Sequence, residues 1–289
     1  MAKCQAKRYT RCMYIGVDIG GSKILVAASD DGKRIVRQQK IETPDDGNQG
    51  VAELIQLIEQ VAGEDAITAI AVASAGPLDL KAGRVLPPAP NMHGWRDVEI
   101  VGPIQNHFKV PTILEVDSVA AALAESEIGA GRGYPYVLYV TISTGIGTGL
   151  IIDGEPYRGA TGLEGGHIIL DPDGPPCGCG GRGHFESMCS GLAIKRDYGK
   201  YGYQITDPAT WDEIAAKMAL GLHSLALAYA PSVVVIGGGV GVHYDQFGHF
   251  LDKHLKTLTP MFKLPPMVQA EYTETAVVYG ALILAARSR

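Results

Sequence analysis

Two segments of the chain carry the same pattern, in which a short apolar strand is followed by a glycine turn and a second apolar strand. In the first, YIGVD (14–18) runs into IGGSK (19–23) and then ILVAAS. In the second, YVLYVTI (136–142) runs into STGIGTG (143–149) and then LIID. Each segment predicts a β-hairpin. The chain therefore carries two similar hairpins, about one in each half, and its fold must accommodate both.

The rest of the chain alternates apolar strands with amphipathic helices. We expect further strands at 35–41, 66–73, 111–116, 232–236 and 267–270, and helices at 50–61, 98–108, 117–129, 212–229, 245–258 and 276–287. The Gly- and Pro-rich stretch 74–91 is expected to be a loop. The first half follows β-β-β-α-β-α-β-α order, which is typical of a mixed sheet with crossover helices. We divide the chain into an N-terminal α/β lobe, 13–122 with 276–289, and a larger C-terminal α/β lobe, 123–275.

One loop of the second lobe has the composition of a metal site. EGGHIILDPDGPPCGCGGRGHFE (164–186) places His167, Cys177, Cys179 and His184 in one short segment. Two thiolates and two imidazoles form a four-ligand set that Zn²⁺ binds tetrahedrally, and four protein ligands make such a site structural. Four polar residues in a Gly-rich surface loop are the alternative. Two carboxylates, Glu164 and Glu186, flank the set.

Three glycine clusters each follow an apolar strand, and together they suggest an anion site. Glycine lets backbone N–H groups approach a phosphate closely. No cluster has the spacing of a Walker A loop, and each alone could be a plain tight turn. Asp18 before the first cluster could serve a Mg²⁺ ion, and Thr144 in the second could bind phosphate oxygens. The residues concerned are Gly20, Gly21, Ser22 and Lys23; Thr144, Gly145 and Gly147; and Gly237, Gly238 and Gly239.

Asp117 stands where a predicted strand passes into a predicted helix. An Asp at this position usually caps the helix. A carboxylate fixed there could also serve as the base that phosphoryl transfer to a hydroxyl requires. Both roles are compatible with the sequence.

Composition excludes several classes of protein. The 289 residues are 46% hydrophobic and 19% charged, which is typical of a globular protein. A net charge of −6 argues against a nucleic-acid surface. We expect no membrane association, since no apolar run is long enough to cross a bilayer. Five cysteines, two of them in the metal loop, make a disulfide framework unexpected and favour the cytoplasm. Cys4, Cys12 and Cys189 carry no evident chemistry.

E-G-G-H followed by C-G-C-G-G-R-G-H-F-E resembles the signature of the ROK family of repressors and sugar kinases. The strand–turn pattern from Tyr14 onward is similar to that of the wider superfamily of actin-like ATPases and sugar kinases. The resemblance implies a two-lobed, duplicated ribonuclease H-like fold with a cleft between the lobes. It implies an ATP-dependent kinase that transfers the γ-phosphoryl of Mg-ATP to a hexose hydroxyl, O6 as in glucokinases. A homodimer or homotetramer would be usual.

The resemblance also assigns roles to single residues. Asp117 would take the proton of the sugar hydroxyl. The first two glycine clusters would bind phosphates and the third would support adenosine. Asn91, in PAPNMHGW, matches an Asn that binds sugar hydroxyls, although a loop Asn can also cap its own turn. Sugar contacts would come from Asn91, Asp117, Glu164, His167 and Glu186.

Three positions depart from the family pattern. His184 stands where a third Cys is usual, which keeps a zinc ligand. Val116 and Val119 stand near Asp117 where the family has Asn. The first Asn normally hydrogen-bonds a sugar hydroxyl, so in this chain either another group binds that hydroxyl or the substrate differs there. Glucose, N-acetylmannosamine and other hexoses therefore remain open. A sugar-binding regulator without catalysis is the alternative of another class.

Overall fold

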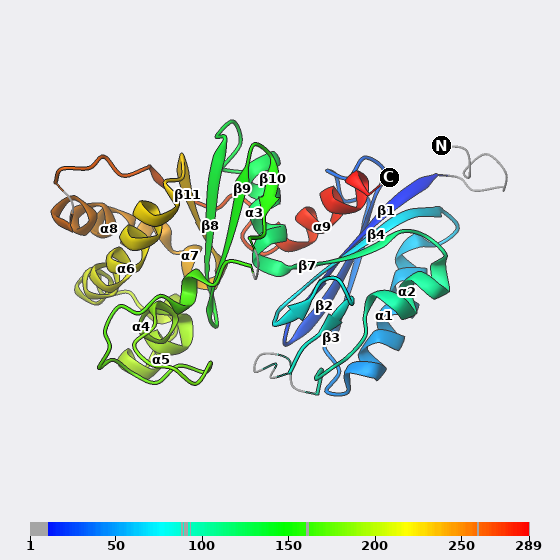
Figure 1. Ribbon diagram of the computed structural model, residues 1–289, viewed down its shortest axis with the longest axis horizontal. Helices are drawn as coiled ribbons and strands as arrows, with labels where there is room; N and C mark the ends of the chain where they lie inside the picture. The colour runs from blue at the N-terminus through cyan, green and yellow to red at the C-terminus, as the bar shows by residue number, and fades with distance from the viewer. Residues whose placement is uncertain are drawn as a thin grey trace. The chain divides into compact units, whose positions relative to one another are not determined.

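A computed structural model of the chain describes residues 11–87, 89, 92, 94–159, 162–258 and 260–288. The chain forms two compact units. The first unit comprises the residues up to Ala124 together with those from Thr275 onward, and the second comprises Glu125–Glu274. Figure 1 shows the elements of each unit.

The first unit is built on a five-stranded sheet of order β3-β2-β1-β4-β7. β1 pairs antiparallel with β2 and parallel with β4, β2 pairs antiparallel with β3, and β4 pairs parallel with β7. The strands are β1 (Cys12–Ile19), β2 (Lys23–Ser29), β3 (Arg37–Glu42), β4 (Ala66–Ser74) and β7 (Thr112–Val116). Because β1 and β4 are buried on both faces, their sequences are almost wholly apolar.

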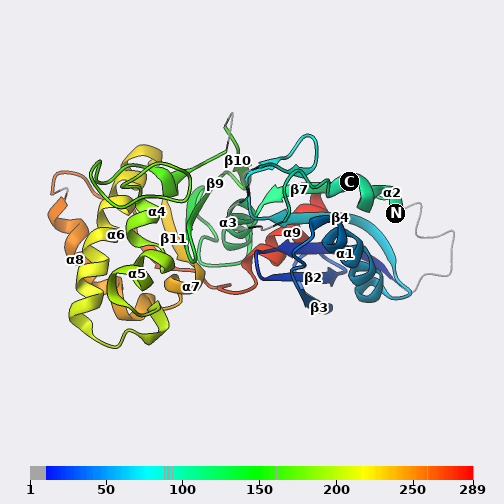
Figure 2. The ribbon, with the colours of Figure 1, turned by 90° about the horizontal axis from the view of Figure 1, so that it is seen from below.

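Helices cover both faces of this sheet (Figure 2). α1 (Gly47–Ala62), capped by the Asp46 side chain, and α2 (Val101–Phe108) lie on one face. α9 (Ala276–Arg287) packs on the other face, where Val278 and Leu282 meet Leu25 and Ala27. α3 (Asp117–Glu127) follows β7 and runs on into the second unit. α9 packs closely on it, since a Cβ at Gly280 would overlap the carbonyl oxygen of Ala120.

The second unit repeats this topology. Its sheet has the order β10-β9-β8-β11-β12, with β9 antiparallel to β8 and β10, and β11 parallel to β8 and β12. The strands are β8 (Tyr136–Ile142), β9 (Ile146–Ile152), β10 (Glu155–Tyr157), β11 (Val233–Gly237) and β12 (Met267–Gln269). In chain order both sheets are arranged 3-2-1-4-5, so the repeated hairpins mark a duplicated unit, as predicted.

One face of the second sheet packs on two long helices. α6 (Pro208–Tyr229) and α8 (Tyr244–Leu258) contribute Trp211, Met218, Leu222 and Phe247 to a core shared with the strands. The remaining helical elements are α4 (Phe185–Cys189), α5 (Gly191–Tyr198), α7 (Gly238–Gly241) and the 3₁₀ turns η1 (Gly165–His167) and η2 (Gly202–Gln204). No helix in the described part of the chain is both long enough and apolar enough to span a bilayer.

Some local expectations were wrong. The stretch expected to be a loop contains a short hairpin, β5 (Leu78–Asp79) with β6 (Arg84–Val85). α6 begins four residues before the expected Asp212, because Pro208 occupies its first turn and Asp207 caps it. α5 and β10 were not expected. Cys12 takes part in a disulfide bond, contrary to the expectation that it carries no chemistry.

Candidate functional site

Two aspartates of the first unit lie at one edge of its sheet. β1 and β7 flank β4, and all three strands are parallel, so their carboxyl ends share that edge. Asp18 lies one residue before the end of β1, and Asp117 directly follows β7. In α/β sheets, ligands bind outside the carboxyl ends of the strands. Both residues therefore occupy the position in which a functional carboxylate is expected.

The two carboxylates influence each other. Burial raises the pKa of Asp18 to about 7, the negative charge of Asp117 adds to the rise, and Lys23 opposes it. A pair of acids held together so that one resists ionisation is a suitable ligand for a divalent cation, which relieves their repulsion.

Asp117 occupies the first position of α3. Its Oδ1 accepts the N–H of Ser118 at 2.6 Å. Val116 is half-buried and Val119 is 6% exposed, so neither departure from the family pattern supplies a polar side chain beside Asp117. The carboxylate thus accepts a hydrogen bond within the first turn of the helix, which leaves both its expected capping role and the proposed base role open.

The first glycine turn is a tight connection between β1 and β2. The N–H of Gly20 donates to the carbonyl of Lys23 at 3.0 Å, and the hydroxyl of Thr43 donates to the carbonyl of Gly20 at 2.7 Å. Gly21, Ser22 and Lys23 are exposed. The turn is therefore anchored at its base and open to solvent at its tip.

The second glycine turn connects β8 and β9 in the same way. The N–H of Ser143 donates to the carbonyl of Gly145 at 2.9 Å, and the carbonyl of Ser143 accepts the N–H of Gly191 at 2.7 Å. Ser143 and Thr144 are exposed. This turn and the first therefore occupy equivalent positions in the two repeated sheets.

The third cluster lies between β11 and α7. A Cβ at Gly237 would overlap the hydroxyl of Tyr139, and Gly238 has a φ of +81°. Only glycine fits both positions without strain. Because β8 and β11 are parallel neighbours, the second and third clusters share the carboxyl edge of the second sheet.

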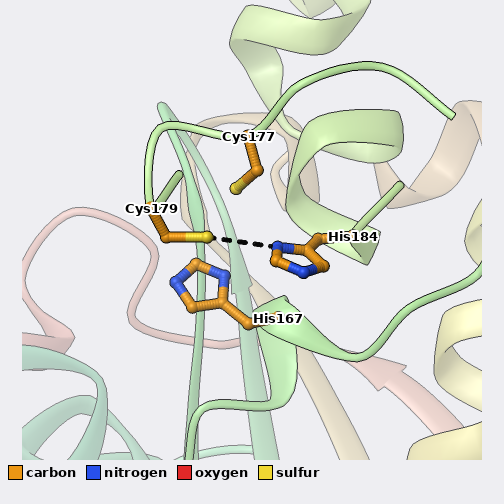
Figure 3. A group of neighbouring side chains, drawn as sticks. All are labelled: His167, Cys177, Cys179 and His184. Atoms are coloured by element: carbon orange, nitrogen blue, oxygen red, sulfur yellow. Dashed lines mark hydrogen bonds between the residues drawn. The ribbon is translucent and has the colours of Figure 1, made fainter. Parts of the chain in front are cut away.

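The four expected metal ligands converge (Figure 3). One ligand atom from each of His167, Cys177, Cys179 and His184 lies within 4.8 Å of the others. The Sγ of Cys179 and the Nδ1 of His184 are 3.3 Å apart. The Nδ1 of His167 is buried and has no hydrogen-bond partner among the described residues. Such a nitrogen is expensive to bury unless a cation takes it up.

The donor set fits Zn²⁺ best. Two sulfurs and two imidazoles match the ligands and the number that a tetrahedral zinc site uses. Burial raises the pKa of the Cys177 thiol, and a bound cation would favour the thiolate instead. Zinc at these residues would close a loop that supplies little apolar surface of its own.

Backbone hydrogen bonds give the metal loop its shape. Gly183 accepts the N–H groups of Leu170 and Asp171, and its own N–H donates to Pro175. Its φ is +66°, and a Cβ would overlap the carbonyl oxygen of Asp171. Glycine at position 183 is therefore required for the loop to close under its ligands.

The flanking carboxylates differ in their surroundings. Glu164 is exposed at the start of η1, where its carbonyl accepts the N–H of His167. Glu186 lies on α4, and its Oε2 accepts the N–H of Ile146 at 2.8 Å. Glu186 is therefore tied to the second glycine turn, a partner that its position in the sequence does not indicate. Asn91 lies outside the described residues.

Sequence reasoning missed one acidic residue, Glu125. Its side chain is 0% exposed. Its carboxylate accepts the N–H groups of Ala130, Glu271 and Tyr272 at 2.8, 3.1 and 2.7 Å. Glu125 thereby fastens the end of α3 to the chain that leaves β12. A Glu directly after the apolar run 119–124 was the available signal.

Comparison with known proteins agrees with this geometry. Residues 14–288 match the model of the ROK family. The chain is 31% identical to a glucokinase of Streptomyces coelicolor, over 80% of this chain and 83% of the relative. It is also 31% identical to an N-acetylmannosamine kinase of Yersinia pestis, over 95% and 98%.

A solved structure gives the same result. The ROK family glucokinase from Streptomyces griseus, in complex with glucose and AMPPNP, is 28% identical and superimposes with a TM-score of 0.83. The match covers 95% of this chain and 99% of that one. The two-unit architecture is accordingly that of the actin-like ATPase fold. With the family model matching almost all of the described chain, the protein belongs to the ROK family.

Proposed function

We propose that this protein is an ATP-dependent hexose kinase. The observation that carries the proposal is the pair Asp18 and Asp117 at one sheet edge, in a chain whose relatives include glucokinases and N-acetylmannosamine kinases. Phosphoryl transfer to a sugar hydroxyl needs one carboxylate for the proton and another for the metal ion that accompanies the nucleotide.

Asp117 is the proposed base. The sugar hydroxyl, O6 in a glucokinase-like reaction, attacks the γ-phosphorus in line. The bond from the γ-phosphorus to the β,γ-bridging oxygen breaks, ADP leaves, and the hydroxyl proton passes to Asp117. Anchoring by the start of α3 keeps the carboxylate in place, which is the contribution the protein can make to positioning. Asp18 is the proposed partner of Mg²⁺.

The glycine turns would hold the nucleotide. In the first turn Gly20, Gly21, Ser22 and Lys23, and in the second Thr144, Gly145 and Gly147, offer amides and hydroxyls to phosphate oxygens. Gly237, Gly238 and Gly239 would support adenosine.

The metal loop would bind the sugar. His167, Cys177, Cys179 and His184 would hold Zn²⁺ and so fix the loop, and Glu164, His167 and Glu186, together with Asn91, would contact the sugar hydroxyls. Glucose and N-acetylmannosamine are the first substrates to test. The side chain of Val116 offers no hydrogen bond, and a buried hydroxyl facing it would lose roughly 1–3 kcal/mol. Substrates are therefore expected to differ most at the hydroxyl beside Val116.

The decisive experiment is a coupled ADP-release assay with Mg-ATP over a panel of hexoses and N-acetylhexosamines. Asp117→Asn should abolish turnover of the preferred sugar while leaving its binding, measured by calorimetry, largely intact. Asp45→Asn, at an exposed aspartate of the same unit, is the matched control. Unchanged turnover in the Asp117 variant refutes its role as base. Sugar binding without any phosphoryl transfer by the wild type would instead identify a sugar-binding regulator.

We further expect the enzyme to act in the cytoplasm, where ATP is supplied, and as a homodimer or homotetramer. Light scattering of the purified protein tests the second expectation.

A further inference from the structure

The second glycine turn is held by one carboxylate. Glu186 accepts the N–H of Ile146 through Oε2 at 2.8 Å. A Cβ at Gly145 would overlap the same oxygen. The carboxylate therefore lies directly against the turn, and glycine at 145 is what allows it to approach so closely.

The other oxygen of this carboxylate faces the metal ligands. The Sγ of Cys177 lies 3.8 Å from Oε1 of Glu186. One side chain thus contacts the glycine turn with one oxygen and the metal loop with the other. Glu186 also follows the ligand His184 by two residues, at the start of α4.

A second connection runs through η1. A Cβ at Gly166 would overlap the carbonyl oxygen of Ile146, and Gly166 directly precedes the ligand His167. Behind the turn, the hydroxyl of Thr148 on β9 accepts the N–H of Gly165 at 3.1 Å. Ile146 is therefore connected to two of the four metal ligands. It reaches Cys177 through the side chain of Glu186, and His167 through Gly166, the residue before it.

Through these contacts a bound metal ion would restrict the conformation of the second glycine turn. A metal centre fixes its ligands, and groups in contact with those ligands are fixed in turn. A turn that binds phosphate through its amides gains affinity when it is held in the binding conformation beforehand. Glu186 contacts both the metal loop and the turn. Fixing its carboxylate at the metal loop should therefore also restrict the conformation of the turn.

We propose that Glu186 is a positioning residue that couples the metal centre to the second glycine turn, so that zinc strengthens binding of the nucleotide phosphates as well as shaping the sugar pocket. This inference rests on the proposed function, because it takes the turn to be a phosphate site. It gives the carboxylate oxygens partners within the protein, in addition to the sugar contact proposed for this residue.

The test measures Mg-ADP affinity by calorimetry without any sugar, so that a sugar contact of Glu186 cannot contribute. Zinc content is determined by mass spectrometry for every sample. Glu186→Ala should bind Mg-ADP about tenfold more weakly than wild type while retaining zinc, as expected for loss of a hydrogen bond to a charged group. Glu186→Gln keeps an acceptor for the N–H of Ile146 and should recover most of that loss. Glu213→Ala, at an exposed glutamate on α6, should match wild type.

Zinc is then removed with a chelator from both the wild type and Glu186→Ala, so that the two changes can be compared singly and together. Its removal should weaken Mg-ADP binding of the wild type by a similar factor and have little further effect on Glu186→Ala, because the connection is already broken. Equal losses in both backgrounds, or wild-type Mg-ADP affinity in a zinc-loaded Glu186→Ala, would overturn the coupling.

The coupling and the proposed function can fail separately. If the wild type phosphorylates a hexose while the alanine variant binds Mg-ADP normally, the kinase assignment stands and the coupling is rejected. If the wild type binds no Mg-nucleotide, both are rejected.

Discussion

Asp18 should make the first unit less stable as the pH rises. Its pKa is raised from an ordinary value of 3.8 to about 7 by burial and by Asp117. Between these values the folded chain holds a proton that the unfolded chain has released. Stability from this group is therefore complete at about pH 4, falls as the pH rises toward 7, and is constant above it. Each pH unit contributes about 1.4 kcal/mol, so the full effect is up to roughly 4 kcal/mol.

Asp18→Asn removes the titration and keeps the shape of the side chain. The variant should match the wild type near pH 4 and exceed its stability by up to about 4 kcal/mol at pH 8, although it should lose kinase activity. Asp117→Asn should lower the pKa of Asp18 and recover part of this gain. Asp45→Asn, at an exposed aspartate of the same unit, is the matched control.

The assay can be confined to the first unit. The chain has two tryptophans, Trp95 in the first unit and Trp211 in the second. In a Trp211→Phe background, the fluorescence of Trp95, which is fully buried, reports urea unfolding of the first unit alone. A difference between wild type and Asp18→Asn that stays constant from about pH 5 to pH 8 would refute the reasoning. Adding Mg²⁺ at pH 8 should stabilise the wild type and leave Asp18→Asn unchanged.

Three further outcomes are expected. Glu125→Ala leaves three part-buried N–H groups without their acceptor and should destabilise the second unit by about 1–3 kcal/mol, measured by urea unfolding; a loss well below about 1 kcal/mol would mean that water replaces the carboxylate. Gly183→Ala should abolish stoichiometric zinc because its Cβ has no room, whereas Gly178→Ala, with nothing within 4 Å, should retain it; equal zinc contents would contradict the loop geometry. His184→Ala should lose zinc, and His184→Cys should retain it as an NS₃ site; zinc retained by the alanine variant would exclude His184 as a ligand.

The sequence predicted features that depend on neighbouring residues. Both hairpins follow from apolar strands joined by glycine turns, and all four metal ligands come from one loop of 167–184. Contacts between residues that are far apart in the sequence were harder to predict. Asp18 and Asp117 meet at one edge only because β4 lies between their strands, which is a matter of topology. The partner of Glu186, Ile146, lies on another element forty residues away, and no pattern in either segment indicates it.

Short elements were also missed for a physical reason. β10 has three residues and α5 has eight, which is too few for a period of apolar residues to be recognised. Both are fixed by their surroundings instead, β10 by pairing with β9 and α5 by the cap that Ser190 provides. The helix starts were displaced where a cap, rather than the first apolar residue, determines where the helix begins.

The duplicated hairpins explain how one scaffold can serve two kinds of chemistry. In the first unit the last pair of the hairpin is Ile19↔Ile24, and in the second it is Ile142↔Ile146. Counting back one residue from each pair, Asp18 corresponds to Thr141. The same position thus carries a carboxylate in one unit and a hydroxyl in the other. A carboxylate there would repel phosphate and attract a cation, whereas a hydroxyl among bare amides repels neither.

The sheets themselves constrain this choice little. Both residues are half-buried and lie one residue before the carboxyl end of a central strand. We expect exchange of an acid for a hydroxyl there to leave the packing of the fully buried Ile19 and Ile142 in place. The repeated topology therefore supplies two equivalent edges, each with a glycine turn proposed to bind phosphate. In the proposed function, the carboxylate of Asp18 would give the first edge the further role of holding the metal ion, whereas Thr141 would leave the second edge to phosphate. Exchanging the two, as Asp18→Thr with Thr141→Asp, should preserve folding measured by circular dichroism and abolish Mg-nucleotide binding; retained binding would show that this position does not divide the two roles.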